Sequence, residues 1–284
     1  MIEKQPVIKP GWQRAVLFAL ALNVLVLLLF TGMGAVMQGS INIYISILLP
    51  AIISITTVYL FRTKIDKRSL TSLGLQWKSN ESHAGTGFFL SILVISIGTL
   101  LLIANGNLDW AGVSLRVSPL LSGLILMMLT AVSEELVFRG YILNNLMQSM
   151  NKWWALLLSA IIFTIFHVNN PGVSILPVLN VFLGGMLLGI NYIYTGNLWF
   201  SILFHAGWNF YQGPVLGYHV SGVNLESLLH PALSGNKILT GAEFGFEGSV
   251  LDAMLTLLAC GLLVWIYEKR FSGGAPKNAA NPQM

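Results

Sequence analysis

The sequence has only one cysteine, Cys260, and it lies in an apolar run. A single cysteine excludes an intrachain disulfide framework and a cysteine metal site, so we interpret Cys260 as a small packing residue. Charged residues are also scarce: they make up 9% of the 284 residues, whereas soluble domains carry about 25%. Together with 55% hydrophobic residues and a mean hydropathy of +0.74, this scarcity predicts an integral membrane protein.

Several signatures of other protein classes are missing. The net charge is +4, but the basic residues are spread through the loops instead of forming a patch, so we expect no nucleic-acid partner. No internal repeat is visible, which argues against a transporter built from two related halves. The chain also lacks the G-x-S-x-G turn of serine hydrolases and the H-E-x-x-H helix of zinc proteases.

Apolar segments long enough to cross a bilayer recur along the chain, since a spanning helix needs about 20 mostly apolar residues. We predict about eight transmembrane helices, at residues 14–37, 41–61, 84–104, 120–149, 153–167, 175–194, 198–211 and 250–267. The first is too long for the apolar core of a signal peptide, so we expect it to be retained. The sequence therefore predicts an all-α, polytopic membrane protein.

The distribution of basic residues predicts the orientation of these helices. Thirteen of the 15 Lys and Arg residues fall on one side of the predicted topology, and only Arg116 and Lys237 on the other, so the positive-inside rule places both termini in the cytoplasm. The resulting regions are residues 1–117 with helices one to three and a polar cytoplasmic loop at 62–83, residues 118–212 with helices four to seven, an extracytoplasmic loop at 213–249, the last helix at 250–270, and a disordered tail at 271–284.

Helix four carries a charged group where apolar residues are expected. Ser133, Glu134, Glu135 and Arg139 interrupt the run at 126–145, and an ionised carboxylate in hydrocarbon costs roughly 2.5–3.5 kcal/mol. Glu135 and Arg139 are four positions apart on a helix, so we expect them to form an ion pair. The side chain of Glu134 points about 100° away, which leaves its carboxylate available for chemistry.

Histidines on two other helices can reach the level of Glu134. If helices four and five turn near residue 150, the residue level with Glu134 is about 167, which is His167. His205 and Asn209 share one face of helix seven. His205 lies only about 13 Å from the turn that precedes this helix, so that turn must be recessed. A cavity open toward the cytoplasm would allow this.

These side chains suit hydrolysis by an activated water molecule. A carboxylate beside a neutral imidazole, here Glu134 and His167, can hold and deprotonate a water. His205 and Asn209 can donate hydrogen bonds to an oxyanion that develops on a carbonyl. Taken singly, each histidine is also compatible with a packing role, and the whole set with a proton pathway in a transporter. The rival nucleophile Ser133 lacks the required turn; we interpret His83, His219 and His230 as surface residues, and Phe138, Phe163 and Trp208 as cavity walls or packing residues.

Three motifs on successive helices carry a family resemblance: Glu134-Glu135-x-x-x-Arg139, Phe163-x-x-x-His167 and His205-x-x-x-Asn209. In this order they resemble the motifs of the CPBP family of intramembrane endopeptidases, which includes CAAX prenyl protease 2 and bacteriocin-processing or self-immunity proteins. The resemblance covers about residues 118–212. It extends more loosely to residues 69–75 and to the Gly-rich segment at 240–248.

The resemblance implies an all-helical core in a bacterial-type cell membrane, with the site between the central helices. It implies that Glu134 activates water with His167, that His205 and Asn209 form an oxyanion hole, and that Glu135 and Arg139 support the site. We therefore expect a glutamic intramembrane peptidase without metal or cofactor, which contacts membrane lipid and cleaves a membrane-associated peptide or protein near the cytoplasmic face. The alternatives are a zinc-dependent hydrolase with Glu134, His167 and His205 as ligands, and a non-catalytic scaffold or immunity protein.

Overall fold

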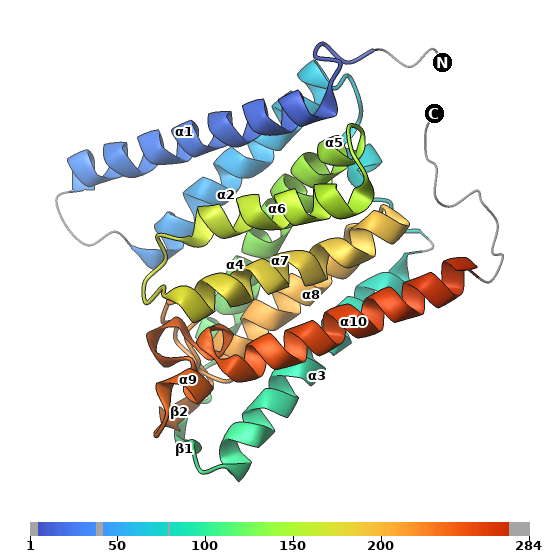
Figure 1. Ribbon diagram of the computed structural model, residues 1–284. Coiled ribbons are helices and arrows are strands. Elements are labelled where there is room, and N and C mark those ends of the chain that lie inside the picture. The colour runs from blue at the N-terminus through green and yellow to red at the C-terminus, as the bar shows by residue number, and fades with distance from the viewer. Residues whose placement is uncertain (1–4, 38–41, 79, 273–284) are drawn as a thin grey trace.

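The computed structural model describes residues 5–37, 42–78 and 80–272, and these segments fold into a bundle of helices (Figure 1). The α-helices are α1 (Gly11–Met37), α2 (Ile43–Leu60), α3 (Glu81–Ala104), α4 (Val117–Glu135), α5 (Asn144–Met147), α6 (Lys152–His167), α7 (Ile175–Thr195), α8 (Trp199–Phe210), α9 (Lys237–Thr240) and α10 (Val250–Ser272). The shorter elements are the π-helical turns η1 (Phe61–Ile65), η3 (Leu136–Leu143) and η4 (Tyr211–Val215), the 3₁₀ turns η2 (Leu70–Leu73), η5 (Ala242–Phe244) and η6 (Phe246–Gly248), and the strands β1 (Leu108–Val113) and β2 (Leu229–Leu233). The predicted all-α polytopic fold is confirmed, because the described residues form only two short strands.

The number of membrane-spanning helices differs from the prediction. Six helical segments are long and apolar enough to cross a membrane: α1, α2 with η1, α3, α4 through α5, α7 and α10. α6 has 16 residues and α8 has 12, fewer than the about 20 that a crossing needs. Eight spans are therefore not confirmed for the described residues, and the cytoplasmic placement of both termini stays a prediction. Most of the predicted disordered tail, residues 273–284, lies outside the described residues, and α10 continues to Ser272.

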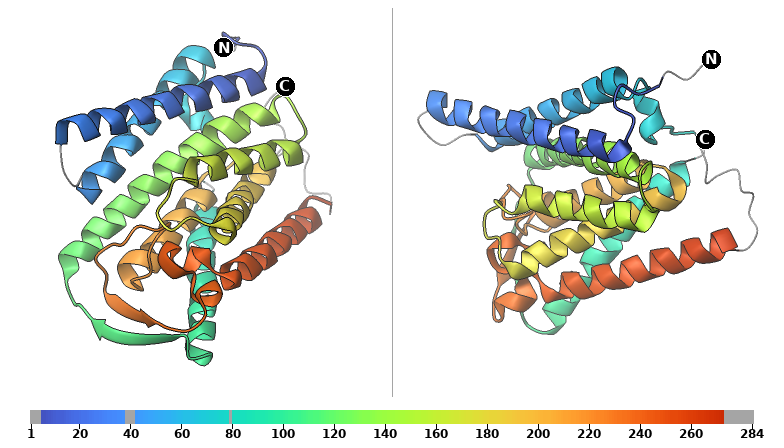
Figure 2. Two further views of the ribbon diagram at one scale, coloured as in Figure 1. Left: turned by 60° about the vertical axis from the view of Figure 1, so that its left-hand side comes forward. Right: turned by 45° about the horizontal axis from the view of Figure 1, so that its top comes forward.

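Helix α8 lies at the centre of the bundle. Nine of its 12 residues are buried, and it packs against α3, α4 and α7. Gly87 lets α3 approach closely, since a Cβ atom at this position would lie 2.3 Å from the backbone oxygen of Phe200. Small residues at such crossings are common where membrane helices meet. Figures 1 and 2 show α1 and α2 on one side of this centre and α10 on the opposite side.

The bundle has two distinct ends. α1 begins and α10 ends at one, which we call the termini end, whereas the two strands and residues 212–249 lie at the other, which we call the loop end (Figure 1). β1 and β2 pair antiparallel, with Leu108 opposite Leu233 and Val113 opposite Leu229. This two-stranded sheet joins the segment just before α4 to the long loop that precedes α10.

The segment 62–83 is only partly a surface loop, contrary to the prediction. Arg62 and Leu73 are buried, and the backbone N–H of Leu198 donates a 3.1 Å hydrogen bond to the oxygen of Gly74. The segment therefore covers the turn before α8 at the termini end. The chain itself thus packs against that turn, while the depth of the turn in the membrane stays a prediction.

A buried carboxylate, Asp66, ties this segment to two helices. Its side chain lies 3.2 Å from Nη1 of Arg14 and 2.8 Å from Nη1 of Arg62, and the hydroxyl of Tyr141 donates to it at 3.1 Å. All four residues are almost fully buried. Two arginines that the sequence assigned to solvent-exposed orienting positions are therefore ion-paired inside the protein.

The fourth predicted helix is continuous from Val117 to Met147, two residues short of its predicted end at 149. It changes from α-helical to π-helical at η3, directly after the pair of glutamates. From α6, the hydroxyl of Ser159 donates a 3.0 Å hydrogen bond to the backbone oxygen of Phe138 within this turn. π-Helical turns inside α-helices are frequent at functional sites, and the sequence periodicity did not predict this one.

Candidate active site

Glu134 on α4 and His167 at the end of α6 face each other. Oε2 of Glu134 lies 3.6 Å from Nε2 of His167, so the prediction that these residues are level is confirmed. The antiparallel packing of the two helices on either side of one turn explains the match, although the π-helical turn η3 departs from the regular α-helical rise of 1.5 Å per residue. The Glu134 side chain is 26% exposed, whereas its neighbour Glu135 is fully buried.

His205 on α8 joins both glutamates. Its Nε2 lies 3.9 Å from Oε2 of Glu134, and its Nδ1 donates a 2.8 Å hydrogen bond to Oε1 of Glu135. The structure thus brings together side chains from α4, α6 and α8, as the three motifs predict. The hydrogen bond to Glu135 was not predicted.

In both imidazole rings, Nδ1 forms a hydrogen bond with an oxygen and Nε2 is directed toward Glu134. Nδ1 of His167 lies 2.7 Å from the backbone oxygen of Phe163, and a carbonyl oxygen can only accept, so this nitrogen carries the hydrogen. Nδ1 of His205 likewise faces a carboxylate. In a neutral ring the other nitrogen is then an acceptor, so both Nε2 atoms present lone pairs toward Glu134. Oε2 of Glu134 itself is buried and accepts no hydrogen bond from the protein.

Arg139 compensates the buried charge of Glu135. Its Nη1 donates a 2.8 Å hydrogen bond to Oε1 of Glu135, which confirms the predicted ion pair. Its Nη2 donates to the backbone oxygen of Gly185 at 3.1 Å, and its guanidinium carbon lies 4.5 Å from the ring centre of Phe163. Arg139 is therefore held in the protein interior by α6 and α7, so it is not a loop charge that could orient the chain.

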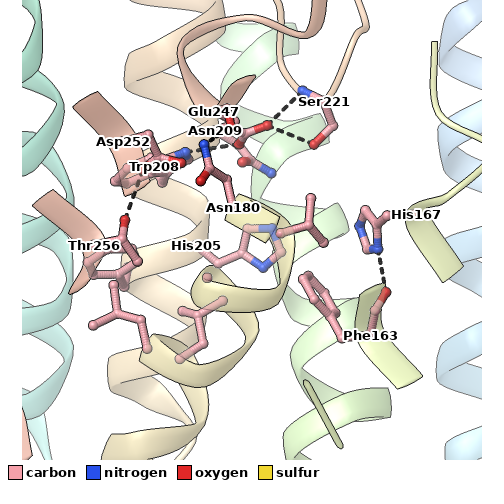
Figure 3. Close-up of a pocket in the computed structure, with 15 residues that line it drawn as sticks. Phe163, His167, Asn180, His205, Trp208, Asn209, Ser221, Glu247, Asp252 and Thr256 are labelled. Carbon is pink, nitrogen blue, oxygen red and sulfur yellow. Dashed lines mark hydrogen bonds between the residues drawn. The ribbon is translucent and has the colours of Figure 1, made fainter. Parts of the chain in front are cut away.

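Two cavities meet at this group of side chains. The outer cavity, of about 320 Å³, contains Glu134 and extends between α1, α2 and α4. The inner cavity, of about 70 Å³, lies between α6, α7, α8 and α10 (Figure 3). Four residues line both cavities and form the wall between them: His167, His205, Asn209 and Ser221. Asn209 lies one turn after His205, as predicted, and its side chain makes no hydrogen bond to the described residues.

Sequence reasoning missed several polar residues around the inner cavity. Glu247 accepts hydrogen bonds from Nε1 of Trp208 at 2.9 Å and from the backbone N–H and hydroxyl of Ser221, both at 2.8 Å. Burial raises the pKa of the Glu247 carboxyl, while these donors oppose that rise. Asn180, Asp252 and Thr256 also belong to the polar lining, and the sequence analysis named none of them. Only the Gly-rich segment at 240–248 could have pointed to Glu247, and nothing in the sequence singled out the other three.

The remaining predictions about individual side chains agree with the structure only in part: His83 and His219, predicted as surface residues, are half-buried. Phe163 and Trp208 line the inner cavity and Phe138 the outer one. His219 and His230 line neither cavity; His230 is exposed and its Nε2 lies 2.8 Å from the hydroxyl of Ser114.

A comparison with protein families finds a match over the central part of the chain. Residues 116–211, from the start of α4 to the end of α8, match the family described as type II CAAX prenyl endopeptidase Rce1-like. The match confirms the resemblance to the CPBP and CAAX protease family. This segment therefore carries a domain of an intramembrane CAAX-type endopeptidase family, in an integral, multi-pass membrane protein. No curated protein matches the chain.

Proposed function

We propose that the chain is a glutamic intramembrane peptidase, in which Glu134 and His167 activate a water molecule. The observation that carries this proposal is the convergence of three acceptor atoms: Oε2 of Glu134 and Nε2 of His167 and His205, at 3.6 and 3.9 Å from the carboxylate oxygen. These distances are too long for direct hydrogen bonds and suit a water molecule shared between the groups. Such a water would donate its two hydrogens to two of these three acceptors. A group that accepts a hydrogen bond from the water is also placed to remove its proton.

The charge balance of the site supports this role. Glu134 and Glu135 carry two negative charges when ionised, and Arg139 supplies one positive charge at 2.8 Å from Glu135. One proton shared among Glu134 and the two imidazoles brings the group to neutrality, which a low-dielectric interior favours. The site can therefore accept a proton from water and release it again without leaving an isolated charge.

The oxyanion is assigned to His205 and Asn209. Because Nδ1 of His205 donates to Glu135, its Nε2 can donate only when the ring carries a second proton, which the proton shared within the site can supply. The Asn209 amide is free of other hydrogen bonds among the described residues and lies on the same wall. Together they can bind a negative oxygen that develops on a scissile carbonyl.

The reaction then needs no covalent nucleophile. The water oxygen bonds to the carbonyl carbon while one water proton passes to Glu134. The bond between carbon and nitrogen breaks as this proton moves, directly or through His167, to the leaving nitrogen. The products are a peptide with a new carboxyl group and one with a new amino group.

The outer cavity is the proposed binding place for the substrate. Its walls are largely apolar and include Val26, Phe30 and Pro50 from α1 and α2, and Val220 and Leu225 from the loop end. Such walls suit an apolar segment of a membrane-associated peptide. The contribution of loop-end residues favours access from that end, in place of the cytoplasmic-face cleavage expected under the predicted topology.

Zinc is the alternative for the same side chains, since carboxylate oxygen and imidazole nitrogen are zinc ligands. Within the described residues, no group of three or more His, Cys, Asp or Glu side chains has an arrangement that could hold a metal ion. The metal-free reaction is our proposal, and metal removal distinguishes it from the zinc-dependent one.

The substitution Glu134→Gln tests the proposal. It keeps the size of the side chain and removes its ability to take a proton, so cleavage is expected to stop while the protein still accumulates. Peptides released from membranes of cells with the native chain and with Glu134→Gln would be compared by mass spectrometry. The control is Glu226→Gln, which removes an exposed carboxylate 3.2 Å from Arg116. Identical peptide profiles for all three proteins would contradict the proposal and favour a non-catalytic partner.

A further inference from the structure

The inner cavity is lined by hydrogen-bond acceptors that lack a donor. Two carboxyl groups, that of the buried Asp252 and that of the half-buried Glu247, line it together with the amide of Asn180 (Figure 3). No Lys or Arg of the described residues forms an ion pair with either carboxyl. A buried charge without a partner is costly, so this cavity is suited to a positively charged occupant.

Asn180 gives an independent indication of a ligand. Its Nδ2 donates two hydrogen bonds of 2.7 Å, to the backbone oxygens of Glu247 and Ser249. These bonds fix which end of the amide is nitrogen. Its Oδ1 is buried and accepts no hydrogen bond, although the residue is only 3% exposed. An unpaired buried acceptor of this kind costs free energy unless a donor reaches it.

Asp252 also has capacity to accept. Its Oδ1 accepts a 2.9 Å hydrogen bond from the hydroxyl of Thr256, and the described residues offer no donor to Oδ2. Ser221 uses its hydroxyl hydrogen on Glu247, so its oxygen lone pairs remain available on the wall shared with the outer cavity. The unpaired acceptors that we find deep in the inner cavity are therefore Oδ1 of Asn180 and Oδ2 of Asp252, whereas the unused amide donor of Asn209 lies on the wall shared with the outer cavity.

We propose that the inner cavity binds a primary ammonium group of the substrate, with Asp252 and Asn180 as its acceptors. A primary ammonium carries three N–H donors and one positive charge on a compact group. The volume of about 70 Å³ is several times the roughly 10–15 Å³ that one water needs, so it accommodates such a group with a short methylene stem. As a substrate subsite this inference rests on the proposed function, because the cavity shares its wall with the proposed oxyanion donors.

Gly184 offers a way to close the cavity without disturbing its polar groups. It lines the inner cavity, and a Cβ atom at this position would meet no heavy atom within 4 Å. The substitution Gly184→Leu therefore fills the space from α7. Asp252→Asn is the complementary change, since it keeps the shape and the bond to Thr256 and removes the charge.

The first experiment measures binding without any cleavage. The purified full-length protein in detergent is titrated with ethylammonium chloride, and the thermal unfolding midpoint is recorded. Sodium chloride and ethanol serve as probes that lack the ammonium group or the charge. We expect ethylammonium alone to raise the midpoint, about tenfold weaker binding in Asp252→Asn, and no effect in Gly184→Leu. The matched control is Asp109→Asn, which changes an exposed carboxylate on β1 and is expected to bind as the native chain does.

Equal responses to ethylammonium and sodium, or native-like binding in both cavity variants, would overturn the inference. Because the two variants alter charge and space separately, failure of one to fold leaves the other as the test. The Glu134→Gln variant shows which of the two proposals fails. If this variant still cleaves peptides while ethylammonium binding is confirmed, the proposed reaction is wrong and the ammonium subsite still stands.

The second experiment identifies the source of the ammonium group. Cleavage sites in membrane peptides are compared between the native chain and Gly184→Leu. A Lys side chain as the source predicts lysine at a fixed position from the cleaved bond, whereas an amino terminus predicts cleavage at a fixed distance from the substrate's first residue. Either pattern should weaken in Gly184→Leu. Native cleavage sites with neither pattern would contradict a substrate subsite.

Discussion

Nδ1 of His205 donates a 2.8 Å hydrogen bond to Oε1 of Glu135, the same oxygen that accepts a 2.8 Å bond from Arg139. One buried carboxylate oxygen thus fixes the histidine of α8 and the guanidinium held by α6 and α7. Glu135 therefore sets the ring orientation that aims Nε2 of His205 at Glu134. The two adjacent glutamates therefore have different roles: Glu135 orients the side chains of the site, and Glu134 faces the outer cavity.

Replacing Glu135 is expected to destabilise the protein. Glu135→Gln removes the negative charge and leaves Arg139 buried without its partner, which costs about 3 kcal/mol in such pairs. The thermal unfolding midpoint in detergent should fall clearly below that of the native chain. Glu226→Gln, at an exposed ion pair with Arg116, should leave the midpoint nearly unchanged, because exposed pairs contribute little. Equal midpoints for the two variants would contradict the structural role of Glu135.

Substitution of two glycines on α3 distinguishes the effect of close packing from the effect of helix propensity. A Cβ atom on Gly87 would lie 2.3 Å from the backbone oxygen of Phe200 on α8, whereas a Cβ atom on Gly85 would meet nothing within 4 Å. Gly87→Ala should therefore cost about 1–3 kcal/mol of unfolding free energy through overpacking. Gly85→Ala should be neutral or slightly stabilising, since alanine favours a helix. Unfolding in detergent of the two variants measures the difference, and a Gly87→Ala protein as stable as Gly85→Ala would refute this packing.

Filling the outer cavity should impair cleavage without loss of stability. Ser54 on α2 lines this cavity, whereas Thr56 on the same helix is exposed and does not line it. Ser54→Phe is expected to reduce peptide release, because the added ring occupies the space proposed for the substrate. Thr56→Phe adds the same ring outside the cavity and should release peptides as the native chain does. Full activity of Ser54→Phe would place the substrate elsewhere.

Metal removal distinguishes the two forms of the proposed hydrolase. A reaction driven by Glu134 and His167 alone should continue at an unchanged rate after dialysis against a strong zinc chelator. A zinc-dependent reaction should stop and recover when zinc is added back. Elemental analysis of the purified protein supplies the parallel measurement. Loss of cleavage with recovery on zinc addition would replace the metal-free mechanism.

The sequence predicted the parts of the site that depend on regular helix geometry. Glu135 and Arg139 are four positions apart on one helix, and Glu134 and His167 lie at equal sequence distances from one tight turn, so regular helix geometry predicts both pairs even though the π-helical η3 lies between Glu134 and the turn. The motif order also indicated the family. These features need only the local helix and the contact between neighbours in the chain.

Other features required the folded chain. The segment at 62–83 is polar in sequence, yet Arg62 and Asp66 are buried because each neutralises the other. Charge counting alone cannot separate such internal pairs from loop charges. The short α8 was predicted as a full span, since its apolar residues suit a protein interior as well as a lipid bilayer.

The amino-acid sequence by itself determined a multi-pass helical membrane protein, the family that its central segment resembles, and a carboxylate level with an imidazole on the next helix. Only the tertiary structure decided that Glu135 binds His205, and that Glu247, Asn180 and Asp252 surround a second cavity behind the histidines. The physical reason is that helical periodicity relates residues within a helix and across a tight turn. Contacts between α7, α8, α10 and an irregular loop depend on how distant segments pack, and no local repeat in the sequence encodes them.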